Sequence, residues 1–303
     1  MTEKEQKYAG IIPAFYACYE DDGTVSVERT KALTRYFLEK GVKGVYVGGS
    51  SGECIYQSVA ERKTVLEAVV EAAEGKLTII AHVACNNTQD SQELAAHAES
   101  LGVDAIAAIP PIYFKLPDAA VAKYWNDISS AAPNTDFIIY NIPVLAGVAL
   151  STGLLRDMMK NPRVIGVKNS SGATQDIQMW HDEGAIVFNG PDEQLISGLT
   201  MGAIGGIGGT YAAMPELFIE AMAQLQAGNI ATAFAIQNDI CRIIYAFFEA
   251  KSNMYATIKG ILREGGLELG GVRAPLLNLS EGDMATVKKC KAMIDEAIAK
   301  HCN

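Results

Sequence analysis

The sequence alternates along most of its length between short apolar runs and longer amphipathic stretches with a helical repeat. Strands that are apolar on both faces and are separated by helices form a parallel sheet, which those helices cover. Eight such runs favour a closed barrel, which needs about 250 residues, over an open sheet. The runs are residues 11–18, 44–48, 77–83, 105–109, 137–140, 164–168, 185–188 and 203–207.

The stretches between the runs carry helix start signals. Ser58 and Glu61 have the spacing of a capping box, and Ser280 stands before the last helical pattern. We therefore predict a (β/α)₈ TIM barrel over residues 1–227 and a C-terminal helical extension of the same domain over residues 228–303. The helical stretches are residues 28–40, 59–73, 91–100, 119–131, 154–160, 215–226, 230–250, 254–264 and 283–300.

Composition and charge argue against several classes of function and location. A formal net charge of −10 argues against nucleic acid as a partner, because binding phosphate needs a basic surface. The charged N-terminus leads directly into the first strand-like run and lacks the apolar stretch of a secretory signal. No run approaches the roughly 20 apolar residues that span a bilayer, so no membrane contact is expected. The six cysteines show no CxxC or framework spacing, which favours reduced thiols and a cytoplasmic protein.

Lys168 is the most informative polar residue, because active sites of such barrels lie at the C-terminal ends of the strands. It closes the apolar run 164–167, where an ammonium group is poorly solvated. With its ordinary pKa of about 10.4, a lysine is neutral in roughly one molecule in a few thousand at pH 7. Burial lowers that pKa and makes the amine a nucleophile toward a carbonyl. The alternative is a lysine that stays charged beside a carboxylate such as Asp192 or Glu193.

Other polar residues follow neighbouring strands. The hydroxyl of Tyr140 can move a proton near Lys168, although tyrosine is also a common core residue with a polar tip. Ser50 and Ser51 stand among glycines that let backbone N–H groups approach a carboxylate, and a tight turn with capping serines is the alternative.

The adjacent carboxylates of Asp192 and Glu193 point in different directions. They therefore suit recognition of hydroxyl groups better than paired acid–base chemistry.

Two classes of bound group are not supported. The glycines of residues 205–209 lack the third spaced glycine and the acidic residue of a dinucleotide fingerprint. Among the four histidines only His82 lies on a strand-like run, and Cys85 three residues later points to the opposite face. We expect neither a metal site nor a cofactor.

Four segments, in this order and spread over essentially the whole chain, resemble the dihydrodipicolinate synthase / N-acetylneuraminate lyase family. They are Gly-Gly-Ser-Ser-Gly-Glu at 48–53, Tyr-Asn-Ile-Pro at 140–143, Gly-Val-Lys at 166–168 and Gly-Gly-Ile-Gly at 205–208. The resemblance implies a barrel with C-terminal helices, usually a homotetramer. It also implies a Schiff base between a lysine and pyruvate or a pyruvate-derived keto acid, with no cofactor.

The same resemblance assigns catalytic roles. Lys168 matches the Schiff-base lysine and Tyr140 the proton-shuttling tyrosine. Ser50 and Ser51 match the hydroxyl pair that holds the pyruvyl carboxylate, and Tyr113 matches the tyrosine that completes the site beside the subunit contact.

Leu145 separates the branches of the family. The synthase branch carries an arginine at this position to hold the carboxylate of its second substrate, and an apolar side chain cannot do so. The lyase branch fits better. Two positions depart from its pattern: Gly209 stands where some members have a serine, and Ser170 replaces a threonine. The expected substrate-binding residues are Ser50, Ser51, Ser170, Gly190, Asp192, Glu193, Gly208, Gly209 and Tyr255.

The expectation that follows is a class I aldolase that reversibly cleaves N-acetylneuraminate to N-acetylmannosamine and pyruvate. Rival activities are 4-hydroxy-tetrahydrodipicolinate synthesis and cleavage of a 2-keto-3-deoxy sugar acid. A non-catalytic sugar-acid sensor is a third alternative, against which the presence of both Lys168 and Tyr140 speaks.

Overall fold

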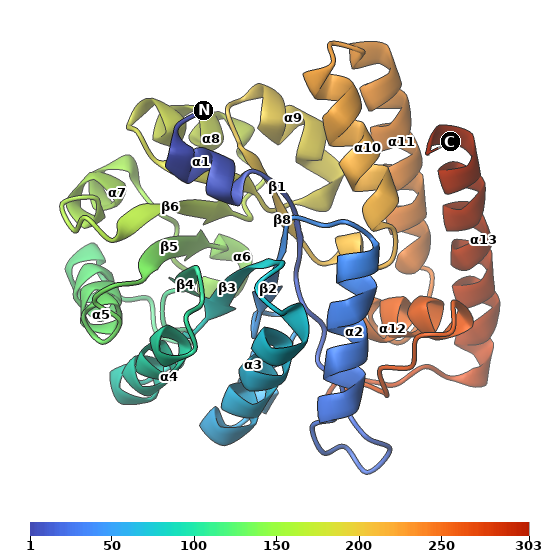
Figure 1. Cartoon of the computed structure of the whole chain (residues 1–303), viewed down its shortest axis with the longest axis horizontal. Coiled ribbons are helices and arrows are strands. Elements are labelled where there is room, and N and C mark those ends of the chain that lie inside the picture. Colours follow the sequence, from blue (N-terminus) through green and yellow to red (C-terminus); the bar gives the residue numbers. More distant parts are fainter. Residues whose placement is uncertain (303) are drawn as a thin grey trace.

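A computed structural model of the chain describes residues 1–302, so only Asn303 of the predicted extension lies outside the described residues. Its centre is an eight-stranded parallel sheet in the order β1-β8-β7-β6-β5-β4-β3-β2, ringed by helices (Figure 1). The ring closes between β1 and β2, where the N–H of Phe15 donates to the carbonyl of Tyr46 at 2.9 Å. The predicted (β/α)₈ barrel is confirmed. The strands are β1 (Gly10–Pro13), β2 (Gly44–Val47), β3 (Thr78–His82), β4 (Ala105–Ala108), β5 (Asp136–Asn141), β6 (Val164–Asn169), β7 (Ile186–Asn189) and β8 (Gly205–Gly208).

The outer layer consists of helices that connect successive strands, and Ser58 and Glu61 form the expected capping box at one of them. The α-helices up to β8 are α1 (Glu3–Tyr8), α2 (Val27–Glu39), α3 (Val59–Ala73), α4 (Thr88–Ser100), α5 (Asp118–Ser130), α6 (Pro143–Ala146), α7 (Thr152–Met158), α8 (Thr174–Asp182) and α9 (Leu195–Thr200). Three short 3₁₀ helices, η1 (Cys54–Tyr56), η2 (Asp192–Gln194) and η3 (Thr210–Ala212), follow β2, β7 and β8. Helices were expected between all the strands, but no bounds were predicted for α1, α6, α8 and α9, whose 4 to 9 residues give little helical periodicity.

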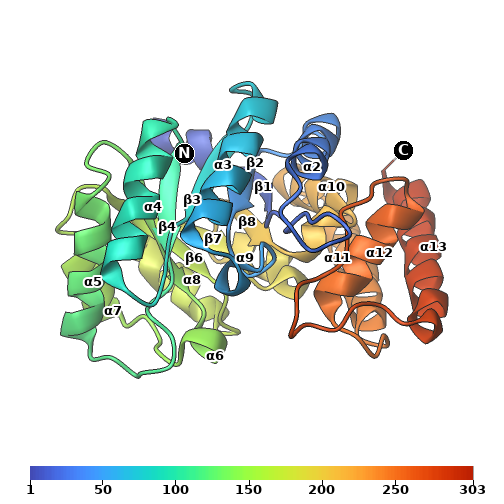
Figure 2. The ribbon, with the colours of Figure 1, turned by 90° about the horizontal axis from the view of Figure 1, so that it is seen from below.

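Beyond β8 the chain is helical, as predicted. The elements are α10 (Pro215–Gln226), α11 (Ile230–Phe247), α12 (Met254–Glu264), η4 (Glu281–Asp283) and α13 (Met284–His301). Ser280 and Asp283 form the capping box that starts the last pair of helices. Helix α11 packs on α10, and α13 packs on α11 and α12, on one side of the barrel (Figure 2). That residues 228–303 extend the same domain stays a prediction.

The first strand is shorter than the apolar run that predicted it. β1 ends at Pro13, whereas the run continues to Cys18. Beyond Pro13 the backbone also forms hydrogen bonds outside the sheet. The N–H of Ala17 donates to the carbonyl of Ser51 at 3.2 Å, and the N–H of Tyr19 donates to the carbonyl of Leu269 at 2.9 Å. The end of the run therefore connects the barrel to the C-terminal segment.

Helix α1 covers the N-terminal end of the barrel, where the sequence indicated only a charged lead-in (Figure 1). The buried hydroxyl of Tyr8 lies 2.7 Å from the carbonyl oxygen of Asp104 and 2.9 Å from Oδ2 of Asp136, two acceptors that share its single proton. Lys4 and Lys7 form ion pairs with the same two aspartates at 3.0 Å. The barrel interior is thus closed at this end.

No helix in residues 1–302 is both long and apolar enough to cross a membrane.

Tyr8→Phe removes the shared hydrogen bond of the Tyr8 hydroxyl without changing the packing of the ring. We expect it to lower the free energy of unfolding by about 1–2 kcal/mol. Catalytic efficiency should stay within about twofold of wild type, because the opposite end of the barrel holds the candidate site. Denaturant unfolding with a steady-state assay tests this, and Tyr245→Phe is the control because that side chain is 63% exposed. Equal stability of the Tyr8 variant and wild type would contradict the role of α1.

Candidate active site

Lys168 and Tyr140 lie directly opposite each other on β6 and β5. Residues that are partners across a sheet present their side chains on the same face, here the barrel interior near the C-terminal end. The Lys168 Nζ atom lies 4.0 Å from the centroid of the Tyr140 ring and 4.3 Å from that of Tyr46. Lys168 is only 4% exposed. Its amine is therefore held between two aromatic rings rather than in water.

This environment changes the charge of the amine. Burial lowers the pKa of Lys168 to about 7, and the carboxylate of Asp192 opposes that shift. At pH 7 roughly half of the amines are therefore neutral. In the described part of the chain, neither Asp192 nor Glu193 forms an ion pair with Lys168, so the alternative of a permanently paired lysine is not what the structure contains.

Ser50 and Ser51 lie on the turn of residues 48–53, which follows β2. The N–H of Glu53 donates to the carbonyl of Ser50 at 3.0 Å and closes the turn. Gly48 has a φ of 74°, in the left-handed region that favours glycine, and a Cβ on Gly49 would stand 2.8 Å from the Tyr46 ring. The glycine pair thus lets the backbone pass closely over the tyrosine ring and brings both serines to the barrel mouth.

Tyr140 contacts hydroxyl groups from two loops. Burial raises the pKa of Tyr140 to about 12, and hydrogen bonds with the side chains of Ser170 and Ser50 oppose the rise. The phenol is therefore protonated at neutral pH, and it is linked to hydroxyls that can exchange protons with it.

Asp192 is buried at the start of η2 and is fixed through one oxygen only. Its Oδ2 accepts the N–H of Thr210 at 2.7 Å and the hydroxyl of Thr210 at 2.6 Å. Its Oδ1 has no hydrogen-bond partner within residues 1–302, and a Cβ on Gly208 would stand 1.7 Å from it. Burial raises the pKa of Asp192 to about 7. One carboxylate oxygen thus lacks a hydrogen-bond partner within residues 1–302, and it occupies the space that the missing side chain of Gly208 leaves.

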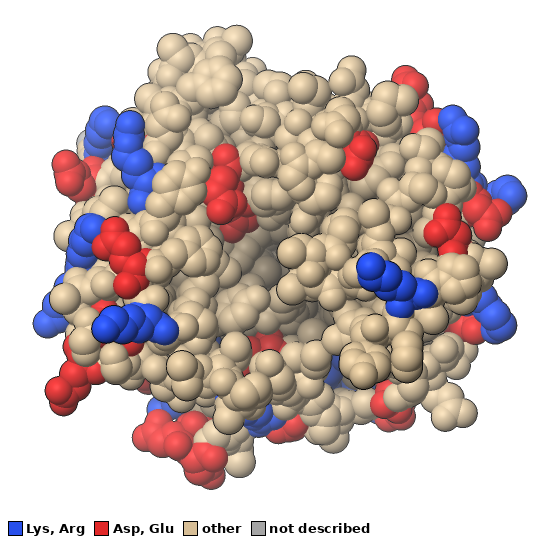
Figure 3. Space-filling model, turned by 180° about the vertical axis from the view of Figure 1, so that it is seen from behind, with Lys and Arg blue, Asp and Glu red and all other residues tan. Residues whose placement is uncertain are grey.

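These residues surround a cavity of about 230 Å³ at the C-terminal end of the barrel. The face opposite α1 is hollowed near its centre (Figure 3). The cavity wall contains nearly all the predicted site residues: Ser50, Ser51, Tyr140, Lys168, Ser170, Gly190, Asp192, Glu193, Gly208, Gly209 and Tyr255. Only Tyr113 of the predicted set is missing. That side chain is 90% exposed in a loop after β4 and contacts Phe114.

Sequence reasoning missed several residues of the wall. Ile244 of α11 and Met254 of α12 line the cavity, and Thr210 fixes Asp192. A helical repeat marks core positions but does not indicate which of them face a distant cavity, so only the tertiary fold reveals the first two. Thr210 follows the glycine-rich end of β8, and its place after a strand end was the available signal.

Lys259 on α12 is a second buried lysine that the sequence did not single out. It is 3% exposed, and its Nζ forms an ion pair with Oε1 of Glu53 at 2.9 Å. Unlike Lys168, it has a counter-ion. The pattern of charges along a helix does not distinguish such a lysine from one that lies in water.

Both ring nitrogens of His82 contact backbone groups. Its Nδ1 lies 2.8 Å from the carbonyl of Gly48, and its Nε2 accepts the N–H of Ile109 at 3.4 Å. Burial, with a contribution from Arg62, lowers the pKa of His82 to about 3. One ring nitrogen therefore contacts the turn of residues 48–53, and the other contacts the backbone that follows β4.

Fold and site together define a class: (β/α)₈ barrels with a buried and partly neutral amine at the mouth. The sequence profile of the Dihydrodipicolinate synthetase family matches residues 7–293. The chain therefore belongs to this family, as the resemblance indicated.

Two kinds of relatives are similar over nearly the full length. The N-acetylneuraminate lyase of Mediterraneibacter gnavus is 62% identical over 299 residues, which cover 97% of this chain and 95% of the lyase. The solved wild-type sialic acid aldolase of Ruminococcus gnavus superposes with a TM-score of 0.96 at 62% identity, covering 97% of this chain and 99% of that one. A catalytic lysine mutant of that aldolase gives a TM-score of 0.97 at 61% identity, with 98% of each chain covered.

The two groups with a pKa of about 7 predict a pH profile. Neutral amine increases as the pH rises through the pKa of Lys168, so kcat/KM should rise with pH, reach half its maximum near pH 7 and level off about one pH unit higher. The Asp192 carboxylate favours the ammonium form, so Asp192→Asn should lower the pKa of Lys168 and move the midpoint to lower pH.

Glu193→Gln is the matched control, because its carboxylate lines the same cavity but is not among the groups that shift the pKa of Lys168. Its midpoint should equal that of wild type. A midpoint that moves to higher pH in Asp192→Asn would contradict this electrostatic account.

Proposed function

We propose that this chain is a class I aldolase that reversibly cleaves N-acetylneuraminate to N-acetylmannosamine and pyruvate. The observation that carries the proposal is the unpaired amine of Lys168, with a pKa of about 7, in a cavity walled by hydroxyls and carboxylates. Relatives that are 61–62% identical over nearly the whole length are an N-acetylneuraminate lyase and a sialic acid aldolase, which is solved both as the wild type and as a catalytic lysine mutant.

The first step binds the keto acid and forms an imine. The hydroxyls and N–H groups of Ser50 and Ser51 hold the substrate carboxylate, and the neutral amine of Lys168 attacks the C2 carbonyl carbon. A nitrogen–carbon bond forms, and the carbonyl oxygen leaves as water after it has received two protons. The protonated imine then serves as the electron sink, so the reaction needs neither a metal nor a cofactor.

Cleavage requires removal of the proton from the C4 hydroxyl. Tyr140, together with the substrate carboxylate, moves this proton, and the hydroxyls of Ser50 and Ser170 stand beside the phenol to pass it on. The C3–C4 bond breaks, its electron pair moves toward the imine nitrogen, and the aldehyde of N-acetylmannosamine leaves. Protonation of the enamine at C3 and hydrolysis of the imine release pyruvate and restore Lys168.

The opposite wall suits a polyhydroxylated tail. We place Asp192 and Glu193 against the hydroxyl groups of the substrate, because both line the cavity with Ser170 and Oδ1 of Asp192 has no hydrogen-bond partner within residues 1–302. Gly190, Gly208 and Gly209 also line the cavity. A short aldehyde would leave the buried Asp192 oxygen without a partner, which favours sugar acids over smaller substrates.

Leu145 argues against the synthase reaction. It lines the cavity and offers no charge to a second carboxylate. The rival that acts on a 2-keto-3-deoxy sugar acid would use the same lysine and tyrosine, so only a direct comparison of substrates separates the two lyase activities.

We also propose that the chain works as a homotetramer in the cytoplasm. The side chains of Tyr113 and Phe114 are 90% and 70% exposed, which suits burial against a neighbouring subunit. In that arrangement Tyr113 of one subunit would complete the site of the next. The cysteines of the described residues are free, in keeping with a reducing compartment.

The test compares cleavage of N-acetylneuraminate with condensation of pyruvate and aspartate semialdehyde, each followed by product formation. Cleavage should dominate, and Lys168→Ala should lower it by at least about 10³-fold because the nucleophile is lost. Dominant synthase activity would overturn the assignment based on Leu145, and wild-type cleavage by Lys168→Ala would overturn the mechanism.

A further inference from the structure

The glutamate that ends the turn of residues 48–53 has no role in the mechanism above, yet it is among the most buried charged residues. The side chain of Glu53 is 0% exposed. Its φ of 50° lies in the left-handed region, which a non-glycine residue adopts only where its surroundings hold it. The contacts of its carboxylate supply that restraint.

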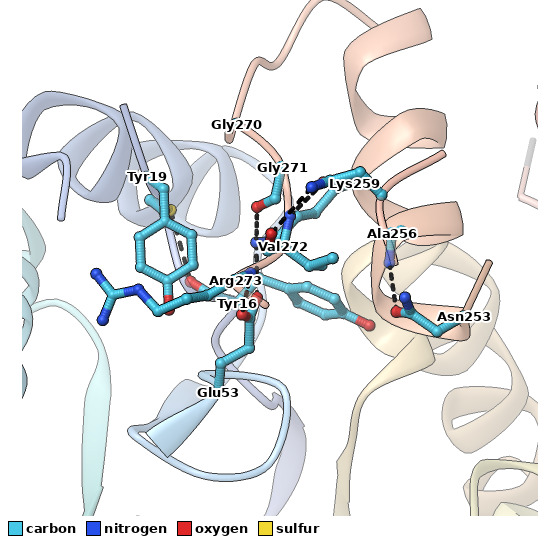
Figure 4. Close-up of polar contacts among 12 residues, drawn as sticks. Tyr16, Tyr19, Glu53, Asn253, Ala256, Lys259, Gly270, Gly271, Val272 and Arg273 are labelled. Atoms are coloured by element: carbon cyan, nitrogen blue, oxygen red, sulfur yellow. Dashed lines mark hydrogen bonds and ion pairs between the residues drawn. The ribbon is translucent and has the colours of Figure 1, made fainter. Parts of the chain in front are cut away.

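Both carboxylate oxygens of Glu53 bind groups from the far end of the chain (Figure 4). Oε1 pairs with Nζ of Lys259 at 2.9 Å, and Oε2 accepts the backbone N–H of Arg273 at 2.8 Å. Lys259 also donates to the carbonyl of Gly271 at 2.6 Å. The ammonium and the carboxylate are thus each held at two points, three residues after Ser50.

The segment that supplies these groups is itself well fixed. The side-chain oxygen of Asn278 accepts the N–H of Val272 at 2.7 Å, and its amide donates back to the carbonyl of Val272 at 3.1 Å. Asn253 caps α12 and donates to the carbonyl of Leu277 at 2.6 Å. A rigid loop therefore carries Gly271 and Arg273 to the turn.

Tyr19 completes the arrangement from the barrel side. Its ring lies 4.9 Å from Nζ of Lys259 and 4.6 Å from the guanidinium carbon of Arg273. The guanidinium also donates to the carbonyl of Tyr56 at 2.8 Å, beyond the turn. The end of the turn and the 3₁₀ helix η1 that follows it are thus held by one C-terminal segment.

We propose that Lys259 is a positioning residue, which through Glu53 sets the orientation of Ser50 and Ser51 toward the carboxylate of the keto acid. Helix α12 places Tyr255 in the cavity wall and Lys259 one turn later on the same face. The C-terminal segment therefore acts on carboxylate capture and not on the amine. The inference rests on the proposed function of the two serines.

The experiment traps the imine of pyruvate with borohydride in the intact chain and measures adduct formation against pyruvate concentration. For Lys259→Met we expect the half-saturating pyruvate concentration to rise at least tenfold, with a maximal trapping rate within about threefold of wild type. Lys259→Arg, which keeps a cation, should recover at least part of the loss. Glu53→Gln, which keeps the shape of the side chain, should show the same rise as Lys259→Met. If Lys259→Met does not fold, the Glu53→Gln variant tests the proposal in its place.

Glu61→Gln is the matched control. Glu61 binds Arg273 at 2.7 Å and belongs to the same network, but it lies on α3 outside the turn. This variant should unfold at a lower temperature and keep the wild-type half-saturating concentration.

Folded Lys259→Met and Glu53→Gln proteins with a wild-type half-saturating concentration would overturn the proposal, as would an equal rise in Glu61→Gln. Absence of any adduct in the wild-type protein would instead contradict the proposed function, so the two failures are distinguishable.

Discussion

The proposed chemistry depends on one buried amine, that of Lys168, which has no counter-ion within residues 1–302. Burial of a charged group without a partner is unfavourable, so burial lowers the pKa of the amine and favours its neutral form. The rings of Tyr46 and Tyr140 exclude water from Lys168 but offer only weak attraction to a cation. The result is a pKa of about 7, which makes a neutral nucleophile available at physiological pH.

Lys259 shows what the same residue type does in the alternative situation. It is as deeply buried as Lys168, but Glu53 and a backbone carbonyl surround its ammonium group. Burial lowers its pKa as well, and Glu53 opposes that shift. Burial therefore has different consequences for the two lysines. Lys168 loses its proton and can react, whereas Lys259 keeps an ion pair that holds a loop in place.

Much of this arrangement could be predicted from the sequence, because the relevant signals are local. Eight apolar runs with helical stretches between them indicated the barrel. Polar residues at strand ends, together with the resemblance to the family, indicated the candidate site residues, and the cavity contains all of them but Tyr113. What the sequence did not reveal depends on distant contacts. The pairing of Glu53 with Lys259 joins residues 206 positions apart, and helix α1 is too short for its periodicity to stand out. The exposed position of Tyr113 likewise depends on how a loop leaves the barrel, which no local pattern determines.

The most direct test of the central claim measures where and at which pH the amine reacts. Wild-type protein is treated with pyruvate and borohydride between about pH 5 and 10, and the modified residue is identified by peptide mass spectrometry. We expect a single adduct on Lys168 whose initial rate of formation reaches half its maximum near pH 7, the pKa that burial gives this amine. An adduct on another lysine, or a midpoint close to the ordinary lysine pKa of about 10.4, would contradict it.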